Sequence, residues 1–78
     1  MRTLKEVQIE SLRYEAQNAR PTFKAAALLV ADLIERDDVA ALCSFCKENA
    51  NKKSVQSAHV RAVSYLYEEH ALTPSMYM

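Results

Sequence analysis

Two cysteines lie three residues apart in Cys43-Ser-Phe-Cys46, the pattern in this chain that most resembles a chemical motif. A dithiol redox site of this spacing needs the start of a helix, where the helix dipole lowers the pKa of a thiol. Cys43 instead falls beyond the first turn of a helix predicted to begin after Asp38, and no strand–helix–strand pattern surrounds it. Both cysteines lie on the apolar stripe of that helix, so we interpret them as small core residues.

A zinc site would need the two cysteines to converge with His59 and His70. The histidines lie eleven residues apart on one predicted helix, which separates them by about 16 Å. They are too far apart to share an ion. One arrangement is left open, in which an outside ligand completes a site formed by Cys43, Cys46 and His59. We therefore predict no resident metal and no cofactor.

No set of side chains with catalytic chemistry falls on a common helix face. The adjacent acids Asp37-Asp38 and Glu68-Glu69 point in different directions on a helix. No serine–histidine–acid arrangement and no glycine-rich loop is present, so a pocket with converging polar groups is not predicted. We predict that the protein is not an enzyme.

The composition indicates helices as the elements that position these residues. The chain of 78 residues contains no glycine, and tight β-hairpin turns depend on that residue. Helix-favouring Leu, Ala, Glu, Lys and Arg are abundant. Any left-handed helix stop is expected at Asn49 or Asn51. We predict an all-α fold.

The apolar periodicity predicts a compact bundle of four helices, over residues 3–19, 22–36, 38–49 and 54–70. Residues 1–72 form one domain packed around the second helix, which contains the long apolar run 25–34. On the third helix the stripe expected to be buried is Val39, Leu42, Cys43, Cys46 and Ala50. The tail 73–78 is either flexible or docked through Met76, Tyr77 and Met78.

The first, second and fourth helices each carry more apolar surface than one core contact requires. The side chains that we assign to a protein interface are Tyr14, Leu28, Val60, Tyr65, Tyr67, Met76 and Tyr77. The alternative is that this surplus is all core, because single-helix wheels overstate exposure in a small bundle. We expect a small non-enzymatic protein that acts by protein–protein contact, as a regulator, inhibitor or adaptor. It is expected to pair as a homodimer, with a separate protein target as a compatible role.

A nucleic-acid-binding regulator is the alternative function. Segment 38–70 has the order of a helix-turn-helix, and its candidate contacts with nucleic acid are Lys52, Lys53, Gln56, Ser57 and Arg61. The formal net charge is zero and the sequence pI is about 6.7, well below the basic range typical of such proteins. We rank this function second.

The sequence predicts a cytoplasmic protein that does not bind membranes. The first residues lack the apolar segment of a secretory signal. The apolar run 25–34 is about half as long as the apolar segment that a membrane-spanning helix needs. Two cysteines without an export signal suggest free thiols in a reducing compartment.

Overall fold

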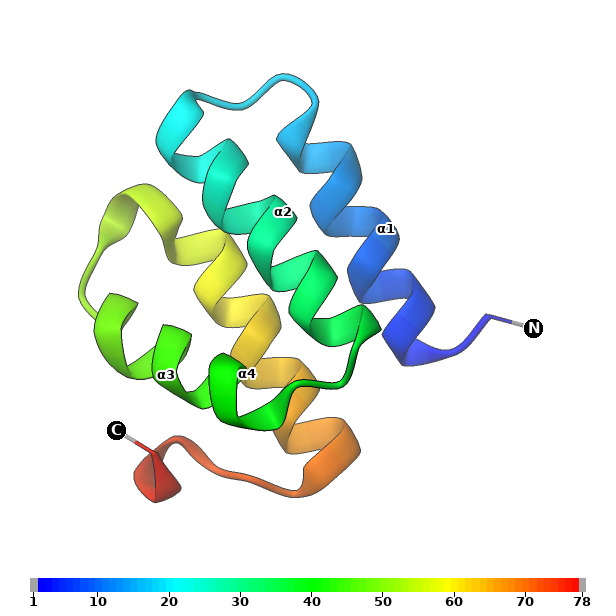
Figure 1. The fold of residues 1–78 in the computed structure, drawn as a ribbon, viewed down its shortest axis with the longest axis vertical. Coiled ribbons are helices and arrows are strands. Elements are labelled where there is room, and N and C mark those ends of the chain that lie inside the picture. Colours follow the sequence, from blue (N-terminus) through cyan, green and yellow to red (C-terminus); the bar gives the residue numbers. More distant parts are fainter. Residues whose placement is uncertain (1, 78) are drawn as a thin grey trace.

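The computed structural model describes residues 2–77, which form four α-helices and two short 3₁₀ turns (Figure 1). In chain order these are α1 (Leu4–Ala16), α2 (Pro21–Glu35), α3 (Val39–Asn49), η1 (Lys53–Val55), α4 (Gln56–His70) and η2 (Pro74–Met76). This part of the chain contains no strand. The predicted all-α bundle is confirmed.

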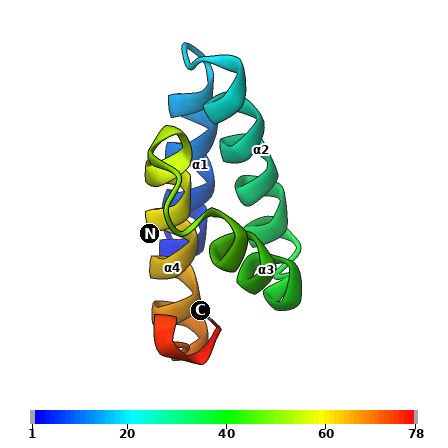
Figure 2. The same ribbon diagram turned by 90° about the vertical axis from the view of Figure 1, so that its left-hand side faces the viewer.

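The helices lie in two layers. Figure 2 shows α1 beside α4 in one layer, with α2 and α3 in the other. The molecule is a thin slab, with principal extents of 34, 32 and 16 Å. As predicted, α2 contacts each of the other three helices, but so does α4. Two helices, rather than one, therefore form the centre of the bundle.

The start of α1 follows its sequence signal, whereas its end does not. The Thr3 side chain accepts a hydrogen bond from the backbone N–H of Glu6 at 3.2 Å and caps the helix at the predicted start, residue 3. The helix ends at Ala16, three residues earlier than predicted, because the chain then tightens into i→i−3 bonds such as Ala19 N–H to Ala16 C=O. Residues 17–19, predicted to be helical, form the turn toward α2.

Proline sets the start of α2. Pro21 is the first helical residue, a position where its missing N–H costs nothing and its fixed φ fits. Arg20 is the N-cap, so the helix begins one residue before the predicted start at residue 22. Asp32 and Arg36, four positions apart, form an ion pair at 3.1 Å on the exposed side.

The turn from α2 to α3 depends on a left-handed residue at Asp37. Its φ is 54°, and the Asp37 and Asp38 N–H groups donate to the carbonyls of Ile34 and Leu33 at 3.0 and 2.9 Å. This is the bonding pattern of a Schellman stop. Asp38 then caps α3 by accepting from the N–H of Ala41 at 3.2 Å, as predicted.

The predicted left-handed stop at Asn49 or Asn51 is wrong. The residues with positive φ are Asp37 and Ala71, because the sharp reversals of the chain fall after α2 and α4. Asn49 remains helical, and its side-chain amide donates to the Phe45 carbonyl at 2.8 Å. Asn51 lies in an ordinary turn.

The core lies between the two layers and includes Leu12, Val30, Ile34, Leu42 and Leu66, each fully buried. The stripe predicted for α3 needs correction. Its inward face is Leu42, Phe45 and Cys46, while Cys43 and Val39 are half-buried and Ala50 is exposed. Phe45 is buried because α3 contacts both α2 and α4, and Ala50 leaves the core because α3 ends at Asn49.

The described part of the chain holds no helix with both the length and the apolar composition to cross a membrane.

Candidate functional site

Three of the seven predicted interface residues lie on the layer formed by α1 and α4. Tyr14 is 74% exposed on α1, and Val60 and Tyr67 are 52% and 55% exposed on α4. Leu4 and Val7 are exposed on the same side of α1 as Tyr14, opposite the buried face of that helix. We call these five residues together the α1–α4 face.

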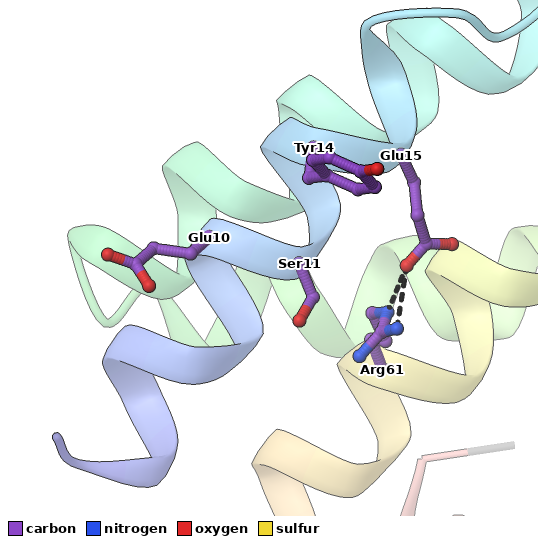
Figure 3. A pocket seen from close by; sticks show the side chains of 5 residues that line it. All are labelled: Glu10, Ser11, Tyr14, Glu15 and Arg61. Atoms are coloured by element: carbon purple, nitrogen blue, oxygen red, sulfur yellow. Dashed lines mark hydrogen bonds and ion pairs between the residues drawn. The ribbon is translucent and has the colours of Figure 1, made fainter.

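Two adjoining hollows connect the two halves of the α1–α4 face. The first has a volume of about 490 Å³, and Figure 3 shows its lining, which comprises Glu10, Ser11, Tyr14, Glu15 and Arg61. The second, of about 630 Å³, is lined by Gln8, Lys53, Gln56, Ser57, Val60, Arg61 and Ser64. Arg61 belongs to both hollows, so Tyr14 and Val60 lie on one continuous surface.

Arg61 is held by polar groups of α1. Its Nε donates to Glu15 Oε2 at 2.8 Å, and its guanidinium also donates to Gln8 Oε1 at 3.0 Å. The Ser57 hydroxyl donates to the same Glu15 carboxylate at 2.8 Å. The centre of the α1–α4 face is therefore a satisfied polar cluster with balanced charge.

These contacts also affect the predicted nucleic-acid residues. Arg61 and Ser57, two of the five, form hydrogen bonds with Glu15 of α1, and Ser57 remains exposed. Lys52, Lys53 and Gln56 are exposed. The five residues therefore fall into two groups, two bonded to Glu15 and three without that contact. The Glu15 carboxylate would also weaken the attraction of Arg61 for a phosphate.

The other four predicted interface residues lie elsewhere. Leu28 is 44% exposed on α2, in the opposite layer, and Met76 is 64% exposed in η2. Leu29, the next residue of α2, is also exposed, at 47%. Tyr77 is half-buried against the core, and Met78 lies outside the described residues. The predicted set does not form one surface.

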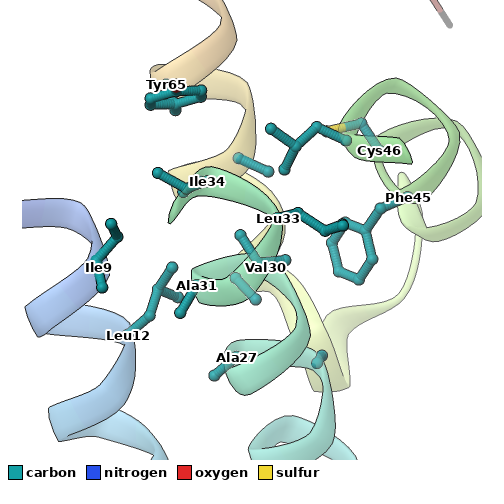
Figure 4. Packing of buried hydrophobic residues seen from close by; sticks show 14 of the residues in the cluster. Ile9, Leu12, Ala27, Val30, Ala31, Leu33, Ile34, Phe45, Cys46 and Tyr65 are labelled. Carbon is teal, nitrogen blue, oxygen red and sulfur yellow. The ribbon is translucent and has the colours of Figure 1, made fainter. Parts of the chain in front are cut away.

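Tyr65 requires a correction, because it is 2% exposed and belongs to the core (Figure 4). The single-helix wheel placed it off the main seam of α4. It is buried because α4 contacts all three other helices, which cover more of its circumference than one seam. Tyr65 is therefore unavailable to a partner.

Tyr65 takes part in a polar cluster that the sequence does not indicate. Its hydroxyl donates to Asp37 Oδ1, and His70 Nε2 lies 2.7 Å from the same oxygen. An ionised carboxylate only accepts hydrogen bonds, so Nε2 carries the proton. The Tyr65 hydrogen bond, followed by that of His70, lowers the pKa of Asp37 below its ordinary value of 3.8. Burial and the same hydrogen bond raise the pKa of Tyr65.

The Asp37 cluster fixes the end of α4 to the turn between α2 and α3. Its members are separated by 28 and 33 residues along the chain, so no local spacing could indicate it. The rings of Tyr65 and His70 also meet edge to face, with centroids 5.7 Å apart. The hydrogen bonds and the ring contact together join three elements of the bundle at this point.

The two cysteines are free thiols with unequal exposure, Cys46 buried and Cys43 half-buried. Burial, followed by the neighbouring Cys43, raises the pKa of Cys46 to about 12. Such a thiol is a poor nucleophile at neutral pH. Across residues 2–77, no three side chains of metal-ligating type gather at one point.

Tyr77 covers Cys46 from the C-terminal segment. Its hydroxyl is buried and finds no conventional partner among the residues that the structure describes. The neighbouring acceptor is the Cys46 sulfur, which accepts hydrogen bonds weakly. Burial raises the pKa of Tyr77 to about 12. The tail thus shields the thiol from solvent.

No family model matches this chain, and searches of curated proteins and of solved structures likewise returned no match.

Proposed function

We propose that this protein acts by protein–protein contact, without catalysis, and that the α1–α4 face is its contact surface. The observation that carries the proposal is the exposure of five large apolar side chains on that face. They are Leu4, Val7, Tyr14, Val60 and Tyr67. As a regulator, inhibitor or adaptor, the protein would cover or connect a partner rather than transform a substrate.

Incomplete folding does not account for these exposed side chains. The accessible surface of the chain is 4987 Å², close to the roughly 4,800 Å² expected for a compact monomer of 8.8 kDa. The core is complete without them. Apolar groups left on the outside of such a bundle are therefore available to a second molecule.

The chemistry of the face suits a protein partner. Tyr14 and Tyr67 are large and amphipathic, and tyrosine is enriched where interfaces concentrate their binding energy. The Arg61 and Glu15 charges between the two apolar strips are already paired, so covering them leaves no isolated charge buried. The two unpaired cysteines support a reducing, cytoplasm-like compartment.

The size of the native complex in cell extract tests this function. Wild-type protein should elute well above the size of one 8.8 kDa chain, and Tyr14→Asp should move it to smaller size. Leu28→Asp is the matched control, because Leu28 is an exposed apolar residue in the opposite layer. Elution of wild type and both variants as single chains would contradict the proposal.

A further inference from the structure

We propose that the turn between α2 and α3 is a hinge, which straightens so that α3, η1 and α4 exchange between two copies of this chain. Asp37, in the middle of the turn, is one of the two residues with positive φ in the described part of the chain. Residues other than glycine adopt this left-handed conformation at a cost in free energy, and they persist in it where their surroundings hold them. The closed turn therefore contains strain that a helical Asp37 releases.

Only two residues have to change conformation to join α2 to α3. Arg36 already has right-handed helical angles, whereas Asp37 has a φ of 54° and Asp38 a ψ of 81°. The chain contains no glycine, and no proline lies between Pro21 and Pro74. Neither of the two residues that most disfavour a helix therefore occurs at this turn. Straightened, residues 21–49 form one helix.

The straight helix also keeps the backbone of the turn hydrogen-bonded. In the closed turn the N–H groups of Asp37 and Asp38 donate to the carbonyls of Ile34 and Leu33, and the N–H of Ala41 donates to the Asp38 side chain. In a continuous helix the same three N–H groups donate to the carbonyls four residues earlier. Opening the hinge therefore leaves none of these donors unpaired.

The contact of Asp37 with α4 holds the turn closed. Its carboxylate accepts hydrogen bonds from Tyr65 and His70, which lie 28 and 33 residues further along the chain. A change in the sign of φ at Asp37 redirects its side chain and removes both bonds. The Asp37 cluster is therefore the lock of the hinge, and it acts only on the closed form.

A second copy of the chain restores the core of an opened molecule. A helix over residues 21–49 is about 43 Å long, which exceeds the greatest extent of the closed chain, 34 Å. Helix α3 then points away from α2 and no longer packs against it. Core side chains of the exchanged part, such as Leu42 and Leu66, lose the α2 surface that covers them. The second copy offers that same surface, and its own exchanged part is covered in return.

Exchange also rebuilds the α1–α4 face twice in each dimer. Each face then combines α1 of one copy with α4 of the other, so the ion pair of Arg61 with Glu15 forms between the two chains. An exchanged dimer presents two such faces, and a single chain presents one. The hinge uses no residue of the α1–α4 face, so the exchange does not depend on the proposed contact function.

Refolding of the purified full chain at high and at low concentration tests the exchange. After refolding at high concentration, wild type should contain a fraction with the mass of two chains in sedimentation velocity. That fraction should persist after dilution, because each bundle must unfold before single chains return. A pair held only by surface contact separates on dilution instead.

Two variants at position 37 isolate the backbone of the hinge. Asp37→Ala and Asp37→Gly both remove the carboxylate, so they differ only in the conformation that they favour. Alanine favours the helix and disfavours positive φ, whereas glycine does the reverse. Asp37→Ala should therefore contain a ratio of exchanged dimer to monomer about tenfold or more above that of Asp37→Gly. Equal ratios would overturn the hinge.

A variant outside the hinge tests the lock. Tyr65→Phe combined with His70→Gln leaves the sequence of the turn unchanged but weakens the hold on Asp37, so its dimer fraction should exceed that of wild type. Ala71→Gly is the matched control. Ala71 is the other residue with positive φ, and it follows α4 rather than joining α2 to α3, so its dimer fraction should equal that of wild type. Circular dichroism verifies that each variant is folded.

A distance within one chain tests the straight helix itself. Spin labels on non-canonical amino acids replace Thr22 and Glu48, which are exposed near the two ends of the joined helix. In a dimer diluted with unlabelled chain the labelled backbone positions should lie about 39 Å apart, farther than in the monomer. The same distance in monomer and dimer would overturn the straightening.

The exchange and the contact function fail in distinguishable ways. A mass of one chain for both wild type and Asp37→Ala after refolding at high concentration overturns the exchange. It leaves the contact function untouched, since that function is read from the complex in cell extract and its sensitivity to Tyr14→Asp. An exchanged dimer, in contrast, should form equally well in Tyr14→Asp, because Tyr14 is 74% exposed and lies outside the hinge.

Discussion

Arg61 of α4 lies against Glu15 of α1, with Nε 2.8 Å from Oε2, although 46 residues separate them in the chain. The pair connects the two helices that form one layer of the slab. Through this contact the exposed strips of α1 and α4 become one surface. The guanidinium is also one of the five groups that the sequence offered as contacts with nucleic acid.

The Arg61–Glu15 pair should contribute measurably to stability. Both side chains are 30% exposed, so screening by water is partial. We expect Arg61→Ala to lower the free energy of unfolding by about 1 kcal/mol, measured by urea denaturation. Glu15→Ala should have a similar effect, and the double variant should lose less than the sum of the two.

Arg36→Ala provides the matched control for that prediction. Arg36 pairs with Asp32 on one helix, and both side chains are more than half exposed, at 57% and 56%. Its loss should cost only about 0.3–0.5 kcal/mol. Equal losses for Arg61→Ala and Arg36→Ala would show that the contact between α1 and α4 has no special role.

The buried hydroxyl of Tyr65 should contribute to the stability of the fold through its hydrogen bond to Asp37. Tyr65→Phe keeps the ring in the core but removes the donor to Asp37. We expect a loss of about 1 kcal/mol, which lowers the melting temperature by about 4–8 °C in a domain of this size. Tyr77→Phe is the contrast, because its hydroxyl has no conventional partner and its removal should be neutral. A Tyr65→Phe variant as stable as wild type would contradict the role given to the cluster.

Acid should weaken the same cluster. The pKa of Asp37 is lower in the folded chain than its ordinary value of 3.8. The stabilising effect is therefore fully present above that value. As the pH falls below it, the unfolded chain binds the proton first and stability declines, until the pKa of the folded state is passed. Asp37→Asn should remove this part of the acid dependence in denaturation at a series of pH values. If the free energy of unfolding fell with pH below 3.8 as steeply in Asp37→Asn as in wild type, this role of Asp37 would be refuted.

The two thiols should react at different rates. Cys43 is half-buried, whereas Cys46 is buried, has a pKa raised to about 12 and lies beneath Tyr77. With an alkylating reagent at neutral pH, mass mapping should find Cys43 modified first and Cys46 modified slowly. Tyr77→Ala should speed the modification of Cys46. A rate unaffected by that substitution would show that the tail does not protect the thiol.

Local signals in the sequence predicted the elements of this fold well. Thr3 and Asp38 cap helices where their side chains and spacing indicated, and the missing glycine correctly excluded a β-fold. Leu28 was also correctly placed away from the core. Each of these depends on residues within a few positions of one another.

Features that depend on tertiary contacts could not be predicted in this way. Tyr65 is buried because three helices surround α4, and a wheel treats that helix alone. Glu15 finds Arg61, and Asp37 finds His70, only after the chain has folded. The candidate surface was therefore predicted in part, because Tyr14, Val60 and Tyr67 were assigned to an interface and are exposed. The contact between Glu15 and Arg61, which joins α1 and α4 on that surface, was not predicted.

Photo-crosslinking inside cells tests the central claim, that the α1–α4 face contacts protein, most directly. A photoreactive amino acid replaces Tyr14 in one variant and Leu28 in another, since both positions are exposed and lie in opposite layers. Crosslinks to protein should form from position 14 in clear excess over position 28. A product of twice the chain mass would identify the second copy. Equal or absent crosslinking at the two positions would contradict the assignment of this face.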